Sequence, residues 1–140
     1  MQPYRFKMEK KTWVLTGKIV RGVQKASYFT GLDWVREQCL EKLGFSPYPG
    51  TLNLSIEGND LYTLEQLRNK ETEKLIPPDP AFCEAKVFPV TVKHVKGAVI
   101  IPDEAVRVHG NEVIEVLAPL RLKNALHVDD GDLLTIVVTA

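Results

Sequence analysis

The chain has 140 residues, of which 44% are hydrophobic and 26% are charged. These proportions are ordinary for a single folded domain and exclude a disordered or fibrous chain. The 18 Lys and Arg residues balance the 18 Asp and Glu residues, and the isoelectric point is about 6.8. Because general nucleic-acid binders carry a basic excess, this balance argues against that class.

The sequence contains neither a membrane-spanning stretch nor a secretory signal. No segment approaches the ~20 apolar residues that cross a bilayer, and the polar start of the chain lacks an apolar core. Cys39 and Cys83 lie far apart in the sequence and form no CxxC pair. We expect two buried or half-buried free thiols in a reducing compartment, and therefore a cytoplasmic protein.

The N-terminal part predicts a lead-in followed by a hairpin. Residues 1–11 read as the lead-in, and residues 12–140 as one domain. The β-branched and aromatic residues of 13–20 predict a strand. A polar loop follows, and residues 28–30 predict a short second strand that would pair with the first.

A helix and an alternating strand come next. Apolar residues at helical spacing predict a helix over 32–43, with Asp33 as its N-cap and Gly44 just beyond its end. Apolar and polar residues alternate strictly over 51–56, which predicts a strand with one face in the core. A capping box that starts at Thr63 predicts a second, short helix.

The C-terminal half predicts further short strands, with a break near Pro89. They cover residues 82–95, 97–101, 113–117 and 133–138. Many short strands with one clear helix are typical of a small β-barrel with one or two peripheral helices. The sequence therefore predicts a mainly β fold.

Thr51 and Asn53 lie two residues apart on the polar face of the alternating strand. Side chains at i and i+2 point the same way, with Cα atoms about 6.5–7 Å apart. A hydroxyl oxygen and an amide oxygen can therefore converge on one hard cation. Mg²⁺ prefers oxygen ligands and completes its shell with water and substrate phosphates. The alternative is a strand whose polar face is simply solvated.

The polar loop of residues 22–27 is a candidate phosphate-binding segment. Backbone N–H groups in such a loop can bind phosphates, and Lys25 adds a positive charge. The loop contains a single glycine, Gly22, and does not match a Walker sequence. The alternative is an ordinary hairpin loop.

Glu112 and Glu115 flank a turn-to-strand junction. A carboxylate there can accept hydrogen bonds from a polyol or act as a base. A spacing of three places them on opposite faces of a strand, so they do not form a pair. The alternative is that both are surface charges.

Four sequence blocks occur in a distinctive order. Residues 43–54 contain Pro-Tyr-x-Gly-Thr-Leu-Asn-Leu, residues 97–102 read Gly-Ala-Val-Ile-Ile-Pro, residues 112–119 read Glu-Val-Ile-Glu-Val-Leu-Ala-Pro, and residues 130–132 read Asp-Gly-Asp. This order resembles the archaeal-type CTP-dependent riboflavin kinases. The resemblance covers roughly residues 13–138, nearly the whole chain.

The resemblance implies a six-stranded cradle-loop β-barrel that transfers the γ-phosphate of CTP to the 5′-hydroxyl of riboflavin, giving FMN and CDP. It implies Mg²⁺ ligands at Thr51 and Asn53. A flavin-contacting carboxylate falls on Glu115, which is also the candidate base, and a flavin-contacting threonine of the family aligns with Arg107. The implied nucleotide-binding residues are Gly22, Val23, Gln24, Lys25, Ala26, Ser27, Leu120, Arg121, Leu122 and Lys123.

The nucleotide loop departs from the family pattern, which typically reads Gly-x-Gly-x-Gly-Arg. Here Gln24, Ala26 and Ser27 replace two glycines and the arginine. These replacements restrict the backbone and remove a bidentate phosphate donor, for which Lys25 substitutes only as a point charge. The sequence therefore predicts weaker nucleotide binding than the family pattern would give.

Three functions from different classes remain open. The leading hypothesis is a monomeric, Mg²⁺-dependent riboflavin kinase that uses CTP and binds neither nucleic acid nor membrane. The second is a flavin- or nucleotide-binding module that kept the barrel and lost turnover, which the altered loop favours. The third is a barrel-type DNA-binding regulator, against which the neutral charge and the lack of a basic arm both argue.

Overall fold

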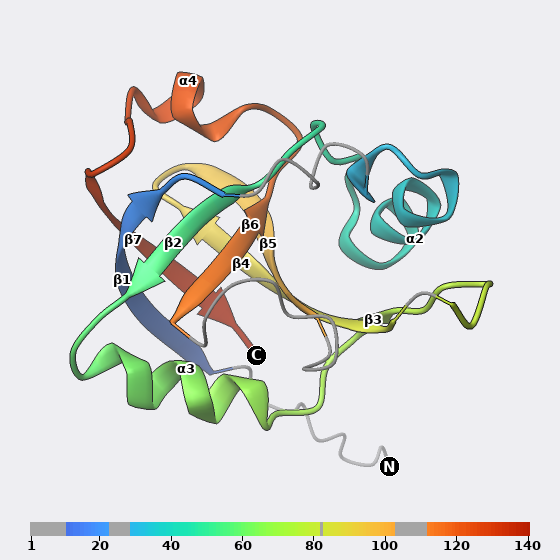
Figure 1. The fold of residues 1–140 in the computed structure, drawn as a ribbon, viewed down its shortest axis with the longest axis horizontal. Coiled ribbons are helices and arrows are strands. Elements are labelled where there is room, and N and C mark those ends of the chain that lie inside the picture. The colour runs from blue at the N-terminus through green and yellow to red at the C-terminus, as the bar shows by residue number, and fades with distance from the viewer. Residues whose placement is uncertain (1–10, 23–28, 82, 103–111) are drawn as a thin grey trace, which may run out of the picture.

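The strands of the protein form a closed barrel (Figure 1). The computed structural model describes residues 11–22, 29–81, 83–102 and 112–140. Within these ranges six antiparallel strands follow one another in the order β4-β5-β6-β2-β1-β7, and a pairing of β4 with β7 closes the ring. Their bounds are β1 Thr12–Val20, β2 Leu52–Ile56, β4 Ala85–Val92, β5 Val95–Pro102, β6 Val113–Leu117 and β7 Leu133–Thr139. The predicted mainly β fold and six-stranded barrel are confirmed.

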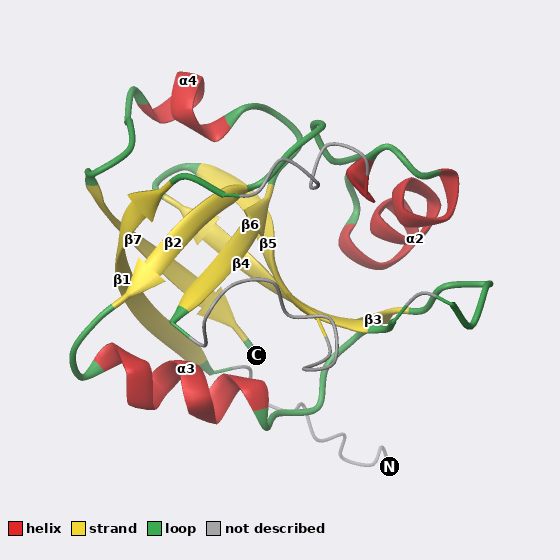
Figure 2. Ribbon diagram, in the orientation of Figure 1, coloured by secondary structure: helices red, strands yellow, loops and turns green. Residues whose placement is uncertain are grey.

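The helices lie outside the barrel (Figure 2). In the described part of the chain they are α2 Asp33–Leu43, α3 Asp60–Arg68 and α4 Leu122–Leu126, one more than the largest number predicted. α3 and α4 lie at opposite ends of the barrel, and α2 lies to one side beside the two-residue strand β3, Lys74–Leu75. None of these helices is long and apolar enough to cross a membrane.

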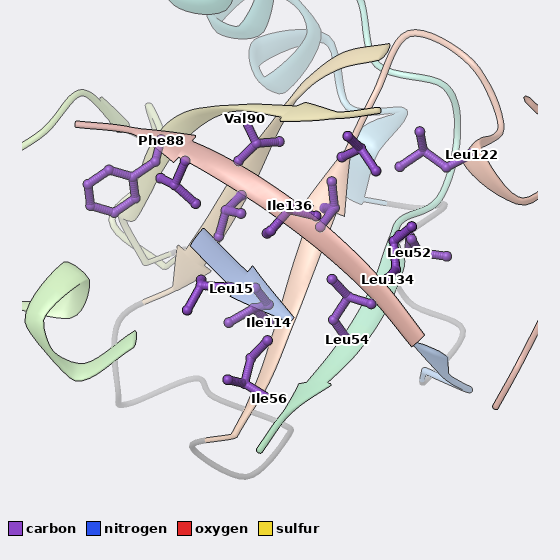
Figure 3. Close-up of a cluster of buried hydrophobic side chains, with 14 of the residues drawn as sticks. Leu15, Leu52, Leu54, Ile56, Phe88, Val90, Ile114, Leu122, Leu134 and Ile136 are labelled. Atoms are coloured by element: carbon purple, nitrogen blue, oxygen red, sulfur yellow. The ribbon is translucent and has the colours of Figure 1, made fainter. Parts of the chain in front are cut away.

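Alternate residues of each strand fill the barrel (Figure 3). Leu52, Leu54 and Ile56 point inward, as the alternation predicted. Leu64 of α3 and Leu122 of α4 join the same cluster, so the two helices close the ends of the core. Burying each such side chain stabilises the fold by roughly 1.5–3 kcal/mol.

A second apolar cluster joins α2 to the outer face of the barrel. Val35 and Cys39 of α2 pack with Val87, Ile100 and Leu117 of strands β4, β5 and β6. The sheet is therefore apolar on both faces where α2 covers it. Phe29 and Leu32, just before α2, pack against the same cluster.

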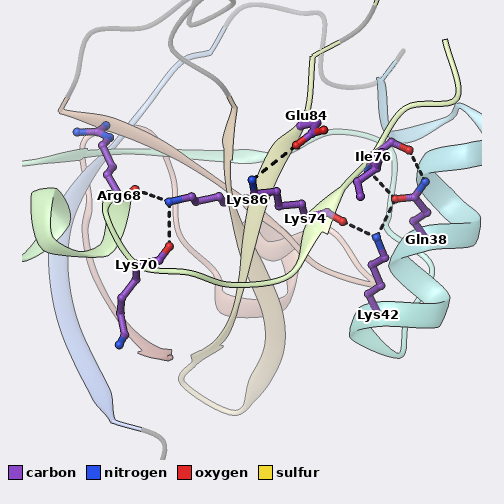
Figure 4. A network of polar contacts seen from close by, with 8 residues as sticks. All are labelled: Gln38, Lys42, Arg68, Lys70, Lys74, Ile76, Glu84 and Lys86. Carbon is purple, nitrogen blue, oxygen red and sulfur yellow. Dashed lines mark hydrogen bonds and ion pairs between the residues drawn. The ribbon is translucent and has the colours of Figure 1, made fainter. Parts of the chain in front are cut away.

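Side chains of α2 also cover the edge of the sheet at β3 (Figure 4). The Gln38 amide donates to the carbonyl of Ile76 (2.6 Å) and accepts the Ile76 N–H (2.7 Å), as a neighbouring strand would. Lys42 donates to the carbonyl of Lys74. These bonds occupy backbone groups that an open edge would offer to another chain.

Two predictions in the N-terminal half were wrong. Phe29 and Thr30 are helical rather than extended, and β1 pairs with β2 and β7 instead of forming a hairpin with residues 28–30, of which residue 28 lies outside the described residues. Asp33 is the first residue of α2, not its N-cap, which is Leu32 without a side-chain cap bond. Gly44 does end the helix, at φ 84°. The strand prediction rested on only three residues, 28–30, and so short a segment shows no periodicity that could distinguish a strand from a helical turn.

Two further boundaries were wrong. β4 runs through Pro89 without a break. Proline has no N–H to donate, but β4 pairs with β7 only at Val90 and Thr91, so no hydrogen bond to β7 is lost at Pro89. α3 begins at Asp60 rather than Thr63. An acidic residue in the first turn stabilises the helix dipole, which favours the earlier start.

Cys39 and Cys83 should differ in how fast their thiols react. Cys39 is buried and Cys83 half-buried, and both are free, as predicted. Burial raises the pKa of the Cys39 thiol to about 11. Because the thiolate is the reactive form, we expect DTNB at about pH 8 to modify one thiol of the native chain rapidly. Cys83→Ser should remove that fast phase, and a variant that still reacts rapidly would contradict this assignment.

Candidate functional site

The candidate residues meet on the outer face of the barrel where β2 pairs with β6. Since Leu52 and Leu54 point into the core, Asn53 points outward. Asn53 lies opposite Glu115 of β6 in the strand register, and opposite Val20 of β1 on its other side. β2 and β6 therefore place an amide and a carboxylate side by side.

Thr51, just before β2, joins this group through a hydrogen bond. Its hydroxyl donates to Oε1 of Glu115 at 2.9 Å. Both side chains are half-buried. The bond uses the hydroxyl proton and leaves the lone pairs of the Thr51 oxygen available to another partner.

The Asn53 carboxamide is buried with an unpaired acceptor. Only 7% of the residue is exposed, and its Oδ1 has no hydrogen-bond partner among the described residues. A buried acceptor without a partner costs about 1–3 kcal/mol, and such groups commonly mark a missing ion or ligand. A solvated polar face is therefore the wrong description of Asn53.

Gly22 packs directly against Asn53. A Cβ atom at Gly22 would lie 2.7 Å from Cγ of Asn53 and closer still to Nδ2. Any side chain at this position would push the carboxamide away. Glycine is thus required here for close approach.

Thr51 and Asn53 fit a divalent cation. They offer one hydroxyl and one amide oxygen, both uncharged, and the amide oxygen has no hydrogen-bond partner among the described residues. No three His, Cys, Asp or Glu side chains converge anywhere in the described ranges. Hard oxygen ligands of this kind suit Mg²⁺ that arrives with anionic phosphates.

A pocket of about 130 Å³ connects Thr51 with the predicted nucleotide segment. Residues 48–52 form one wall, residues 120–123 form the other, and Val116 and Ala118 lie between them. A hydrogen bond from the Tyr48 N–H to the Ala118 carbonyl (2.8 Å) joins the walls. Segments about 70 residues apart in the sequence thus share one site.

The 120–123 segment supplies the positive charge of this pocket. Leu122 is buried in the core and anchors the segment. Arg121 donates to the side chain of Asn124, and the Lys123 ammonium pairs with Asp130 at 2.7 Å. Exposed pairs of this kind contribute little stability, so both cations can exchange these partners for a phosphate.

Several predicted site residues lie outside the described residues. They are Val23, Gln24, Lys25, Ala26, Ser27 and Arg107, and their roles stay predictions. Glu112 is exposed and lies at the far end of β6, where its carbonyl accepts the N–H of Ile56. It does not belong to the group around Thr51.

Sequence reasoning missed two features of the site. Tyr48 and Gly50 line the pocket, although the block that contains them was singled out only as a motif. Thr30 is 1% exposed, and its hydroxyl accepts the N–H of Gly50 at 3.0 Å. No signal pointed to Thr30, because a lone threonine in a short segment has no pattern.

The family comparison covers the whole of this site. A family model for CTP-dependent riboflavin kinases, described as "Domain of unknown function DUF120", matches residues 19–138. The chain belongs to this family. All the described site residues, from Gly22 to Lys123, fall inside the match, which confirms the resemblance seen in the sequence.

Riboflavin kinases from several archaea are similar to this chain. The one from Archaeoglobus fulgidus is 36% identical over 128 residues, covering 89% of this chain and 54% of the relative. The one from Methanosarcina mazei is 32% identical over 131 residues, covering 91% and 57%. The one from Ignicoccus hospitalis is 33% identical over 127 residues, covering 89% and 70%. The chain therefore spans a little over half the length of the first two.

Proposed function

We propose that this chain transfers the γ-phosphate of CTP to the 5′-hydroxyl of riboflavin, giving FMN and CDP. The observation that carries the proposal is the pocket that joins Thr51 to residues 120–123, together with the buried Oδ1 of Asn53, two residues beyond Thr51, which has no hydrogen-bond partner among the described residues. Phosphoryl transfer depends mostly on positioning and charge neutralisation, which these groups can supply. Membership of the family supports the choice of substrates.

Thr51 and Asn53 are the residues that would hold Mg²⁺. When bound with the nucleotide, the cation would neutralise charge on the β- and γ-phosphates. Gly22 allows the carboxamide of Asn53 to lie where it does, because a side chain at position 22 would collide with it. Glu115 fixes the hydroxyl of Thr51.

Arg121 and Lys123 would bind the phosphates, together with Lys25 of the predicted loop. In the described part of the chain, Arg121 is exposed and Lys123 is half-buried, both on the pocket wall opposite Thr51. Charge-assisted hydrogen bonds to phosphate oxygens are about twice as strong as neutral ones. These side chains therefore favour an anionic ligand in the pocket.

Glu115 would orient riboflavin and accept a proton. The 5′-oxygen forms a bond to the γ-phosphorus while the bond from that phosphorus to the bridging oxygen of CDP breaks. The hydroxyl proton passes to the carboxylate. Oε1 of Glu115 accepts the bond from Thr51, and the carboxylate makes no other hydrogen bond with described residues, so Oε2 is the oxygen left for the substrate.

Product analysis tests the proposal. Riboflavin is incubated with Mg²⁺ and each nucleoside triphosphate separately, and FMN is detected by mass spectrometry. We expect FMN with CTP, and none when EDTA removes the cation. A protein that binds riboflavin or CDP in calorimetry but forms no FMN with any triphosphate would be a binding module, the function that the altered loop favours.

A further inference from the structure

We propose that Glu115 is a positioning residue for Thr51 and thereby sets the affinity of the site for the cation, separately from its contact with riboflavin. The inference deepens the proposed function and rests on it. The observation behind it is the hydrogen bond from the Thr51 hydroxyl to Oε1 of Glu115. A carboxylate reserved for riboflavin has no need of this bond.

The bond fixes the direction of the Thr51 lone pairs. A hydroxyl has one proton and two lone pairs, and its O–H bond rotates to suit its partners. Because the Thr51 hydroxyl directs its proton at Oε1 of Glu115, 2.9 Å from its oxygen, the lone pairs point away from the carboxylate and stay available to a cation. The ligand is therefore oriented before the cation binds.

Glu115 also brings a full negative charge next to two neutral ligands. It lies directly opposite Asn53 in the β2–β6 register, where facing Cα atoms are about 4.5–5.5 Å apart. On its other side it faces Ile100 of β5, which is buried and apolar. Among the described residues, the polar neighbours of Glu115 are thus Thr51 and Asn53. A charged group behind a ligand strengthens that ligand toward a cation.

This charge acts in opposite directions on two forms of the nucleotide. The carboxylate attracts Mg²⁺ and so favours the Mg²⁺ complex of CDP. It repels the phosphates of CDP when no cation is present. The dissociation constant of CDP in EDTA, divided by that in excess Mg²⁺, measures how much the cation strengthens binding. Removing the charge of Glu115 should lower the first constant and raise the second, so the ratio should fall.

The test is calorimetric titration of CDP into riboflavin-free protein, in excess Mg²⁺ and in EDTA. Glu115→Leu removes both the charge and the acceptor, and we expect the ratio to fall about tenfold or more. Glu115→Gln keeps a neutral acceptor and should give an intermediate ratio. The matched control is Glu112→Gln, which removes the same charge at an exposed position of the turn before β6. Its ratio should stay within about twofold of wild type, because solvent and salt screen exposed charges.

A double-mutant cycle tests whether Glu115 acts through Thr51. In a Thr51→Val background, Glu115→Leu should lower the ratio by less than it does in the wild-type background, because the positioning of Thr51 is already lost and only the effect of the charge remains. An unchanged ratio in Glu115→Leu, with wild type binding CDP in a Mg²⁺-dependent way, would overturn this inference and leave the proposed function standing. Wild-type protein without Mg²⁺-dependent CDP binding would overturn both.

Discussion

Asn53→Ala should abolish Mg²⁺-dependent formation of FMN while the melting temperature of the metal-free protein stays close to that of wild type. The side chain is buried, so its loss removes packing contacts. Its Oδ1 also has no partner in the described part of the chain, and removing a buried unpaired acceptor relieves about 1–3 kcal/mol, which offsets the lost packing. Loss of a cation worth several kcal/mol to the transition state should slow the reaction roughly a hundredfold or more.

Rates of FMN formation and melting curves with and without Mg²⁺ and CDP measure both effects. Wild type should gain stability when Mg²⁺ and CDP are added together, and Asn53→Ala should gain little. Ser55→Ala is the matched control, because Ser55 is half-buried on the same face of β2, two residues further on. Equal activity of Asn53→Ala and wild type at limiting Mg²⁺ would contradict the ligand role.

Gly22→Ala should also abolish Mg²⁺-dependent formation of FMN, because Gly22 lies against the Asn53 side chain. The added methyl group would occupy the place of the Asn53 carboxamide and displace it. Because both changes remove the same ligand, the double variant Gly22→Ala with Asn53→Ala should be no less active than Asn53→Ala alone. A fully active Gly22→Ala protein would show that the carboxamide does not need its present position.

The elements that sequence predicted correctly are those with a long local pattern. The strand at 51–56 was found because strict alternation over six residues has a single structural interpretation. The helix at 32–43 was found because apolar residues recur at helical spacing and Gly44 marks its end. The prediction of a hairpin with residues 28–30 was wrong because β1 pairs with β2 and β7. Such distant pairings are decided by closure of the barrel.

The site shows the same division between local and distant information. The spacing of Thr51 and Asn53 indicated a pair of oxygen ligands on one face, and the family resemblance indicated their role. The burial of Asn53 against Gly22 follows from the β1–β2 register, which pairs Val20 with Asn53. The bond from Thr51 to Glu115 joins residues 64 apart and depends on the β2–β6 register. Neither strand register can be predicted from a local sequence pattern.

Restoring the family pattern of the nucleotide loop should tighten nucleotide binding. The variant carries Gln24→Gly, Ala26→Gly and Ser27→Arg together, which frees the backbone to approach phosphates and returns a bidentate donor. A charged contact to a phosphate is worth roughly 1.5–3 kcal/mol, so CTP and CDP should bind about ten- to a hundredfold more tightly. Calorimetric titration of both nucleotides measures the change.

Single lysine variants identify which charge holds the nucleotide in the unaltered loop. Lys25→Ala should weaken binding and reduce its dependence on salt, because Lys25 is the cation of that loop. Lys70→Ala is the control: it removes a lysine just beyond α3, the helix at the end of the barrel opposite α4, and the Lys70 ammonium lies over the Trp13 ring. That variant should bind as wild type does. If the restored loop binds no more tightly than wild type, the loop does not limit affinity, and the protein must hold its nucleotide elsewhere, as in the pocket between Thr51 and residues 120–123, or bind none.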